Sequence, residues 1–171
     1  ELYISVVKAL AQHHDGMTRT EISKVIGANG GTLTRVLTNL ERCDFISRSQ
    51  NFGCKTKDTI YRLMDFYTLF YYKFIAQDTS GDEQWWSHNF ESRLVSTWQG
   101  LTFEIVCLMH TDCIKKALGI SGMATEVSSW RKVADDKQRG GQIDLVIKRA
   151  DRIVHLCEMK FSKSEYRITD A

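Results

Sequence analysis

The run from Thr18 to Asp44 restricts the fold more than any other part of the chain. It contains two short amphipathic helices, which a turn that includes Gly27 separates. Thr18 or Thr20 is expected to cap the first helix. The second helix places its apolar side chains on one face: Leu33, Val36, Leu37 and Leu40. Two helices joined in this way predict a helix-turn-helix.

The segments on either side of this run extend the motif. A helix is expected over residues 2–14, because its apolar residues recur at helical spacing and the pattern stops before Asp15-Gly16. A strand, a turn rich in glycine and lysine, and a second strand follow over residues 45–65. Such a hairpin is a wing, so the order of elements predicts a winged helix-turn-helix.

Charge is unevenly distributed along the chain. The 171 residues carry 23 Lys and Arg against 21 Asp and Glu, a formal net charge of +2. Residues 19–62 hold four acidic residues against eight basic ones, and the chain after Leu63 is close to neutral. This difference in charge suggests two domains with two different functions. The eight basic residues are Arg19, Lys24, Arg35, Arg42, Arg48, Lys55, Lys57 and Arg62.

The outward face of the second short helix is polar and basic, and it suits the major groove of duplex DNA. Lys55 and Lys57 at the wing tip suit backbone phosphates. Binding of low sequence specificity is expected. The competing interpretation is a protein-interaction module, because a polar solvent face needs no ligand. The helix residues predicted to contact nucleic acid are Thr32, Thr34, Arg35, Asn39 and Arg42.

The middle of the chain is dense in aromatic residues. Residues 65–77 predict a helix that carries aromatic side chains on almost every side. This pattern favours burial of the helix between the two halves of the chain. A base-stacking platform is the alternative use. A polar loop with a Trp pair follows, and it marks the approximate boundary between the two domains. The expected division is a winged helix over 1–64, a helical connector over 65–84 and an α/β domain over 85–171.

Two apolar strands near the end of the chain carry charged residues. Side chains alternate across a strand, so Asp144 and Glu158 share one sheet face only if the connection is odd in length, as residues 150–152 would be, or contains a bulge. Asp151 is expected to supply the left-handed conformation that such a loop needs. Lys160 would lie on the same face as the two carboxylates. Two adjacent carboxylates make a hard oxygen site for Mg²⁺, and a lysine beside them orients the attacking water. The alternative is a cross-strand salt bridge.

"GQIDLVI" at 141–147 and "HLCEMKFS" at 155–162 are similar to the core of the PD-(D/E)XK nuclease-like superfamily. The resemblance implies a site that holds Mg²⁺ or Mn²⁺ and cleaves phosphodiesters. In this resemblance, the Asp of the family motif corresponds to Asp144, its E-x-K to Glu158 and Lys160, and its helical Glu to Glu104. The Met159 carbonyl would be a further metal ligand, with Gln142 beside the acid. On helix position alone, a solvated Glu104 is the alternative.

The whole chain resembles the C-terminal part of archaeal-type AAA ATPases, which bacteria of the Bacteroides kind also carry. The resemblance implies an upstream P-loop ATPase module as a partner. The chain contains no GxxxxGK[ST], so ATP binding is expected only in that module. Nuclease-like cores continue past E-x-K with a helix and a strand, so an incomplete domain is expected after residue 160. The fold class is α+β.

Three functions stay open at this point: a metal-dependent nuclease tethered to a winged helix, a non-catalytic binding module, and a sensor or toxin-related module that controls the ATPase. The substrate, the pathway and self-association also stay open. No run is apolar enough to span a membrane. A reduced cytoplasmic setting is expected, because no CxxC pair occurs among the five cysteines: Cys43, Cys54, Cys107, Cys113 and Cys157.

Overall fold

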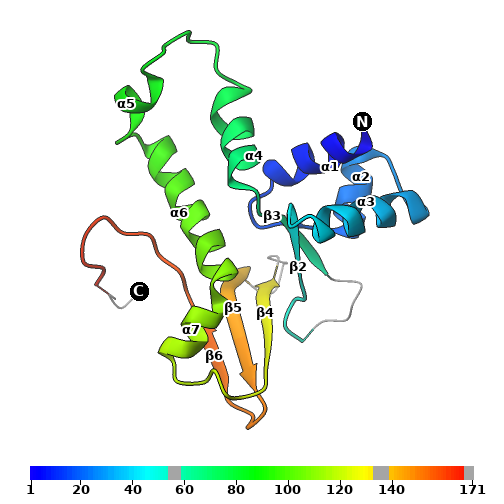
Figure 1. Ribbon diagram of the computed structural model, residues 1–171, viewed down its shortest axis with the longest axis vertical. Coiled ribbons are helices and arrows are strands. Elements are labelled where there is room, and N and C mark those ends of the chain that lie inside the picture. Colours follow the sequence, from blue (N-terminus) through cyan, green and yellow to red (C-terminus); the bar gives the residue numbers. More distant parts are fainter. Residues whose placement is uncertain (54–58, 133–138, 168–171) are drawn as a thin grey trace.

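The computed structural model describes residues 1–53, 59–132 and 139–167. Its N-terminal part is a winged helix, as the sequence predicts (Figure 1). A three-stranded antiparallel sheet in the order β1-β3-β2 lies beside three helices. The elements are α1 (Leu2–Ala11), β1 (Met17–Thr18), α2 (Arg19–Ile26), α3 (Gly30–Arg42), β2 (Ile46–Ser49) and β3 (Ile60–Leu63).

Local signals fix both ends of α2. Thr18 is its N-cap, and the Thr18 hydroxyl accepts a hydrogen bond from the Glu21 backbone N–H. The Glu21 carboxylate accepts one from the Thr18 backbone N–H in return, which completes a capping box. Gly27 ends the helix at φ 67°, a left-handed conformation that glycine adopts without steric cost.

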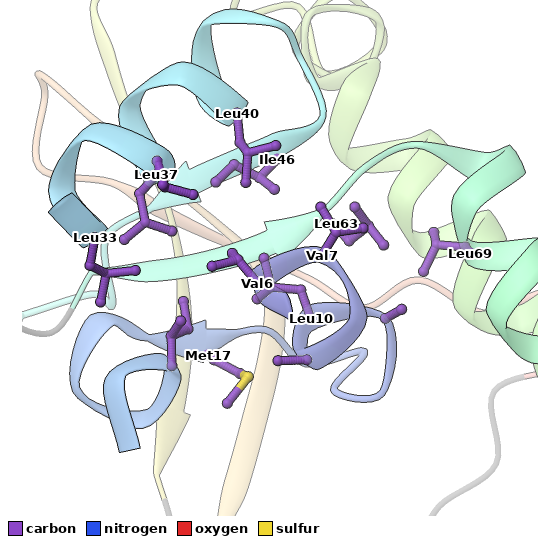
Figure 2. Packing of buried hydrophobic residues seen from close by; sticks show 14 of the residues in the cluster. Val6, Val7, Leu10, Met17, Leu33, Leu37, Leu40, Ile46, Leu63 and Leu69 are labelled. Carbon is purple, nitrogen blue, oxygen red and sulfur yellow. The ribbon is translucent and has the colours of Figure 1, made fainter. Parts of the chain in front are cut away.

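One apolar core holds the winged helix together. The apolar face expected for α3 is buried, and its Leu33, Leu37 and Leu40 meet Val6 and Leu10 of α1 (Figure 2). The same core includes Ile105, which comes from a helix in the second half of the chain. The two halves are therefore joined by shared packing.

Aromatic side chains join the connecting helices. Phe70 lies 5.4 Å from Trp86, and Phe74 lies 5.5 Å from Trp98, between ring centroids. Core packing is thus the use of these rings. The expectation of burial all round is wrong at Tyr67, which is 70% exposed. The connecting elements are α4 (Phe66–Phe70), a π-helical turn η2 (Tyr71–Ile75), α5 (Trp85–Asn89) and α6 (Arg93–Met109).

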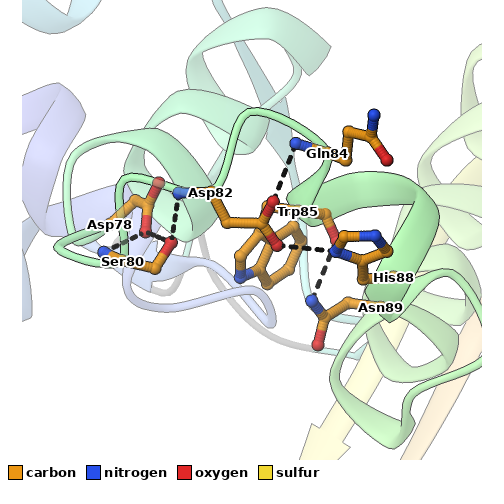
Figure 3. Close-up of polar contacts among 7 residues, drawn as sticks. All are labelled: Asp78, Ser80, Asp82, Gln84, Trp85, His88 and Asn89. Carbon is orange, nitrogen blue, oxygen red and sulfur yellow. Dashed lines mark hydrogen bonds and ion pairs between the residues drawn. The ribbon is translucent and has the colours of Figure 1, made fainter.

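The loop before α5 is organised by side-chain acceptors (Figure 3). Asp78 accepts hydrogen bonds from the backbone N–H and the hydroxyl of Ser80. Asp82 accepts from the Gln84 backbone N–H and pairs with the His88 ring at 2.8 Å. These contacts set the start of α5 and present its Trp pair to the aromatic cluster.

The second half carries its own antiparallel sheet, in the order β4-β5-β6. Leu145 and Ile147 of β5 pack with Ile120 in a small core beneath α6 and α7. The strand expected to reach Phe161 ends at Cys157. Residues 158–167 have no regular structure, so the described part of the chain contains no helix or strand after β6. The elements are α7 (Thr111–Ala117), β4 (Thr125–Lys132), β5 (Gly141–Arg149) and β6 (Val154–Cys157).

No helix in the described part of the chain is long and apolar enough to cross a membrane. The two sheets lie beside each other, with β2 of the first sheet in contact with β4 of the second (Figure 1). The domain boundaries at residues 64 and 84 stay a prediction.

Candidate nucleic-acid interface and acidic cluster

The face of α3 opposite its buried residues is exposed and basic. Thr32, Arg35 and Arg42 are exposed, and no residue that the structure describes forms an ion pair with either arginine. Arg35 and Arg42 are seven residues apart, so they lie on one side of the helix about 10 Å apart along its axis. Two arginines placed this way can contact backbone phosphates of a duplex that lies against α3.

Two further residues of the predicted interface take part in internal contacts. Thr34 donates to the Gly30 carbonyl, and Arg19 reaches both the same carbonyl, at 2.9 Å, and the Thr34 hydroxyl. The Asn39 amide donates to the Tyr3 hydroxyl at 2.6 Å. Asn39 therefore also belongs to the wall of an apolar groove between α1, α3 and α4.

Two sequence-predicted contacts cannot be placed. Lys55 and Lys57 lie outside the residues that the structure describes. Arg48, on the wing strand β2, is described, and its guanidinium pairs with Glu41 at 3.3 Å. The Arg48 side chain is 55% exposed and the Glu41 side chain 35%, so water screens the pair and Arg48 stays accessible to a phosphate.

The register of the second sheet sets which way the two predicted acids, Asp144 and Glu158, face. Leu145 pairs with Cys157 in the antiparallel ladder of β5 and β6. The ladder ends at this pair, and one further step in the same register would put Asp144 opposite Glu158, on the same side of the sheet. The three-residue connection over 150–152 produces this register. Its left-handed residue is Arg152, at φ 72°, whereas the sequence predicts this conformation for Asp151.

Asp144 also has a structural role. Its side chain is 6% exposed, and it accepts hydrogen bonds from the Met159 backbone N–H at 2.9 Å and from the Gln142 amide at 3.3 Å. A side-chain acceptor for a backbone N–H gives the chain an alternative to the ladder. The contact explains why β6 ends two residues before Met159. It also points the Met159 N–H toward the Asp144 carboxylate, and the role of the Met159 carbonyl as a metal ligand stays a prediction.

Lys160 is paired with Glu158 by a short contact between ammonium and carboxylate. Both side chains are about half exposed. The hydrogen bond to Glu158 raises the pKa of Lys160, and the charges of Glu158 and Asp144 add to that rise. Lys160 is therefore protonated at neutral pH, so it can orient a group or donate a proton but cannot act as a base.

Glu104 on α6 is held by an arginine from the winged helix. The guanidinium of Arg62, on β3, lies 3.4 Å from the Glu104 carboxylate, and the two side chains are only 9% and 17% exposed. Burial raises the pKa of Glu104, and Arg62 opposes that rise. The negative charges of Asp144, Asp15 and Glu158 also raise the pKa of Glu104.

A small cleft of about 170 Å³ lies between the two sheets, beside this ion pair. Arg48 and Arg62 line it from the first sheet, and Ser128 and Asp144 line it from the second.

A second contact joins the two sheets at the end of β2. The Asn51 side chain pairs with the backbone of Arg131 on β4, accepting from its N–H at 2.8 Å and donating to its carbonyl at 3.0 Å. The Phe52 backbone N–H donates to the Ser129 carbonyl at 2.7 Å. The amide of Asn51 thus continues the ladder, and the base of the wing is attached to the edge of the second sheet.

The predicted metal ligands do not form a metal site as they are placed. Among the described residues, no three His, Cys, Asp or Glu side chains gather closely enough to hold an ion. Asp144 is engaged by two donors, Glu158 by Lys160, and Glu104 by Arg62. The arrangement is a cluster of three carboxylates and two internal cations.

Sequence reasoning missed two residues of this arrangement, Arg62 and Asn51. Arg62 lies between Tyr61 and Leu63 in a strand, and a charge in such a setting requires a partner. That signal could have marked Arg62 as buried and paired, although it could not have identified Glu104. No local pattern distinguishes Asn51 from an ordinary turn residue.

Comparison with known proteins supports the N-terminal assignment. Residues 6–52 match the MarR family, so this segment is similar to the winged-helix domains of that family. The match runs from α1 to the turn after β2. Such a domain suggests DNA binding. No curated protein and no solved structure matches the chain.

Proposed function

We propose that this chain binds duplex DNA, with α3 against the major groove and with low sequence specificity. The observation that carries the proposal is the exposed pair Arg35 and Arg42 on the helix that a MarR-type winged helix would present to DNA. The predicted wing-tip residues Lys55 and Lys57 would add phosphate contacts. Charge-driven contacts of this kind give affinity without reading the base sequence.

A salt titration tests this proposal. The affinity for a duplex of arbitrary sequence is measured by fluorescence anisotropy across a range of KCl concentrations. Replacement of Arg35 and Arg42 by alanine should weaken binding at low salt and reduce the slope of log K against log salt by about one unit for each lost contact. Lys116→Ala, an exposed basic residue on α7, is the matched control and should bind as the unaltered chain does. An unchanged slope in the double variant would contradict the proposal.

The second half of the chain supports a finer proposal, that it is a nuclease-like domain at the C-terminal end of a P-loop ATPase. This proposal is supported by the pairing of Leu145 with Cys157, which would set Asp144 opposite Glu158 if it continued by one residue, and by the ion pair between Glu158 and Lys160. Glu104 would complete the site. In this proposal Mg²⁺ or Mn²⁺ would supply the activation of water for phosphodiester cleavage. Among the residues that the structure describes, the acids are not gathered into a three-ligand metal site.

A non-catalytic binding module is the second candidate function. It is favoured by the ion pairs Glu104–Arg62 and Glu158–Lys160, which neutralise two of the three carboxylates. Incubation with labelled duplex, junction and single-stranded substrates in Mn²⁺ separates the two candidates. Cleavage that Asp144→Asn abolishes supports the nuclease, and no cleavage alongside intact DNA binding supports the binding module. We also propose that the chain self-associates and that an upstream ATPase module is its partner. Sedimentation velocity tests the self-association.

A further inference from the structure

The last strand of the second sheet has one open edge. β6 pairs with β5 on one side only, and it ends the sheet order β4-β5-β6 (Figure 1). In the described part of the chain, no backbone group forms a hydrogen bond with its other side. Proteins commonly block such an edge with proline or with charged side chains, and β6 contains neither. The edge can therefore accept a further strand.

The register shows which backbone groups point to the open edge. The Arg149 N–H donates to the Ile153 carbonyl at 2.8 Å, so these two residues form a hydrogen-bonded pair. Hydrogen-bonded and non-hydrogen-bonded pairs alternate along an antiparallel ladder. Val154 and Leu156 therefore belong to non-hydrogen-bonded pairs, and their N–H and C=O groups point away from β5.

The same two residues expose apolar side chains. Val154 is 39% exposed and Leu156 is 65% exposed. They are two positions apart in the strand, so their side chains lie on one face of the sheet. A strand added at this edge would receive backbone hydrogen bonds and an apolar contact from the same pair of residues.

We propose that β6 pairs with β6 of a second copy of this chain, antiparallel and around a twofold axis beside His155. This inference rests on the proposed self-association and deepens it by naming the surface. Val154 then lies opposite Leu156 of the second copy, and the reverse holds by symmetry, so the contact is self-complementary. The four outward residues form two hydrogen-bonded pairs, and the two three-stranded sheets become one continuous sheet.

Charge complementarity favours this register. With the axis beside His155, Arg152 lies opposite Glu158 of the second copy at both ends of the contact. Arg152 is exposed and forms no ion pair with any described residue. The Glu158 side chain is 52% exposed beside its own Lys160, so a second cation can reach it. Opposite charges placed across two strands stabilise the pairing.

The two neighbouring registers are less favourable. An axis at Leu156 would place Val154 opposite Glu158, and Arg152 opposite Lys160. An axis at Val154 would place Leu156 opposite Arg152. Each alternative sets an apolar side chain against a charge, and the first also opposes two like charges.

The strength and the place of the contact are measured together. β6 has only four residues, so the interface is small and the dimer should be weak and transient. Sedimentation velocity over about a hundredfold range of protein concentration should show a monomer–dimer equilibrium. Hydrogen exchange by NMR, at the same concentrations, should slow at the Val154 and Leu156 amides as the dimer forms. The His155 and Cys157 amides already bond to β5 and should not change.

Charge reversal tests the register. Arg152→Glu should weaken dimerisation about tenfold or more, because it sets two carboxylates against each other at both ends of the contact. Glu158→Arg should weaken it in the same way. The double variant exchanges the two charges and should restore dimerisation. Both side chains are exposed, and circular dichroism confirms that each variant is folded.

A matched pair of substitutions tests the apolar contact. Leu156→Gln should weaken dimerisation, because it removes an apolar side chain from the contact in each copy. Ile4→Gln is the control: Ile4 is 64% exposed, almost the same as Leu156, but it lies on α1 in the apolar groove. It should dimerise as the unaltered chain does.

Four results would overturn the inference. A chain that stays monomeric at every concentration would refute both this surface and the proposed self-association. A dimer in which the Val154 and Leu156 amides still exchange fast, or which Ile4→Gln weakens and Leu156→Gln does not, would refute this surface alone. Slow exchange of these amides in a monomer would mean that the same chain covers the edge. A double charge variant that stays monomeric would refute the register. None of these outcomes depends on the DNA salt titration.

Discussion

The buried ion pair between Arg62 and Glu104 should contribute little net stability, yet breaking it from one side should be costly. The two side chains are 9% and 17% exposed, so the pair falls in the buried class and not among surface pairs worth under about 1 kcal/mol. Arg62→Met leaves the Glu104 carboxylate buried without a partner. We expect that single change to lower the free energy of unfolding by about 3–5 kcal/mol.

Replacing both partners removes the stranded charge. The double variant Arg62→Met with Glu104→Leu should be within about 1–2 kcal/mol of the unaltered chain, because well-packed apolar pairs often match buried ion pairs in stability. The assay is urea unfolding followed by circular dichroism and by the fluorescence of the four tryptophans. Costs that add within about 0.5 kcal/mol across the cycle would refute the reasoning, since additivity means no coupling between the two side chains.

The same pair predicts a dependence on pH. The pKa of Glu104 is raised in the folded chain, so the folded state holds its proton more tightly than the unfolded state does. The stability that this proton supplies is fully present below the ordinary Glu pKa of 4.5 and is lost as pH rises through the folded pKa. Arg62→Met removes the positive charge that opposes this rise, so Glu104 holds its proton still more readily in the variant. The loss of unfolding free energy in Arg62→Met should therefore be smaller at pH 5, where Glu104 is more easily protonated, than at pH 8.

Two further substitutions test the contacts around the acidic cluster. Asp144→Ala leaves the Met159 N–H without its acceptor and should cost about 1–3 kcal/mol, with faster hydrogen exchange at that amide, whereas Asp144→Asn should keep most of the protection. Normal exchange at Met159 in the alanine variant would contradict the assigned role. Asn51→Ala removes two hydrogen bonds to β4 and should also cost about 1–3 kcal/mol in urea unfolding, whereas its exposed neighbour Gln50→Ala should be near neutral. Equal costs at both positions would rule out a special role for Asn51.

The winged helix could be predicted from local patterns because each of its signals acts over a few residues. The Thr18 cap, the left-handed Gly27 and the buried side of α3 depend on spacing and on turn chemistry alone. The register of β5 and β6 was also accessible, since parity and a three-residue connection determine which residues face each other. Only the left-handed residue of that connection was wrong, at Asp151 in place of Arg152.

The acidic cluster could be predicted only in part, because its partners come from distant segments. Glu104 and Arg62 are 42 residues apart in sequence and meet through the packing of α6 against the winged helix. The strand β4, which Asn51 joins, carries an interrupted pattern with a register shift between Ser128 and Trp130. Neither the pairing of Arg62 with Glu104 nor the attachment of Asn51 to β4 leaves a periodic signal in the sequence. Sequence patterns therefore identified the acids, whereas only the tertiary arrangement identified their counter-ions.

The central claim is that α3 is the surface that binds DNA, and backbone amide mapping by NMR tests it most directly. A short duplex is added to the isotope-labelled chain, and chemical-shift changes are followed at low and at moderate salt. The account predicts the largest changes along the exposed face of α3, around Thr32, Arg35 and Arg42, with loss of the changes as salt increases. Changes confined to the groove formed by α1 and α4, near Ile4 and Tyr67, with α3 unaffected, would contradict it.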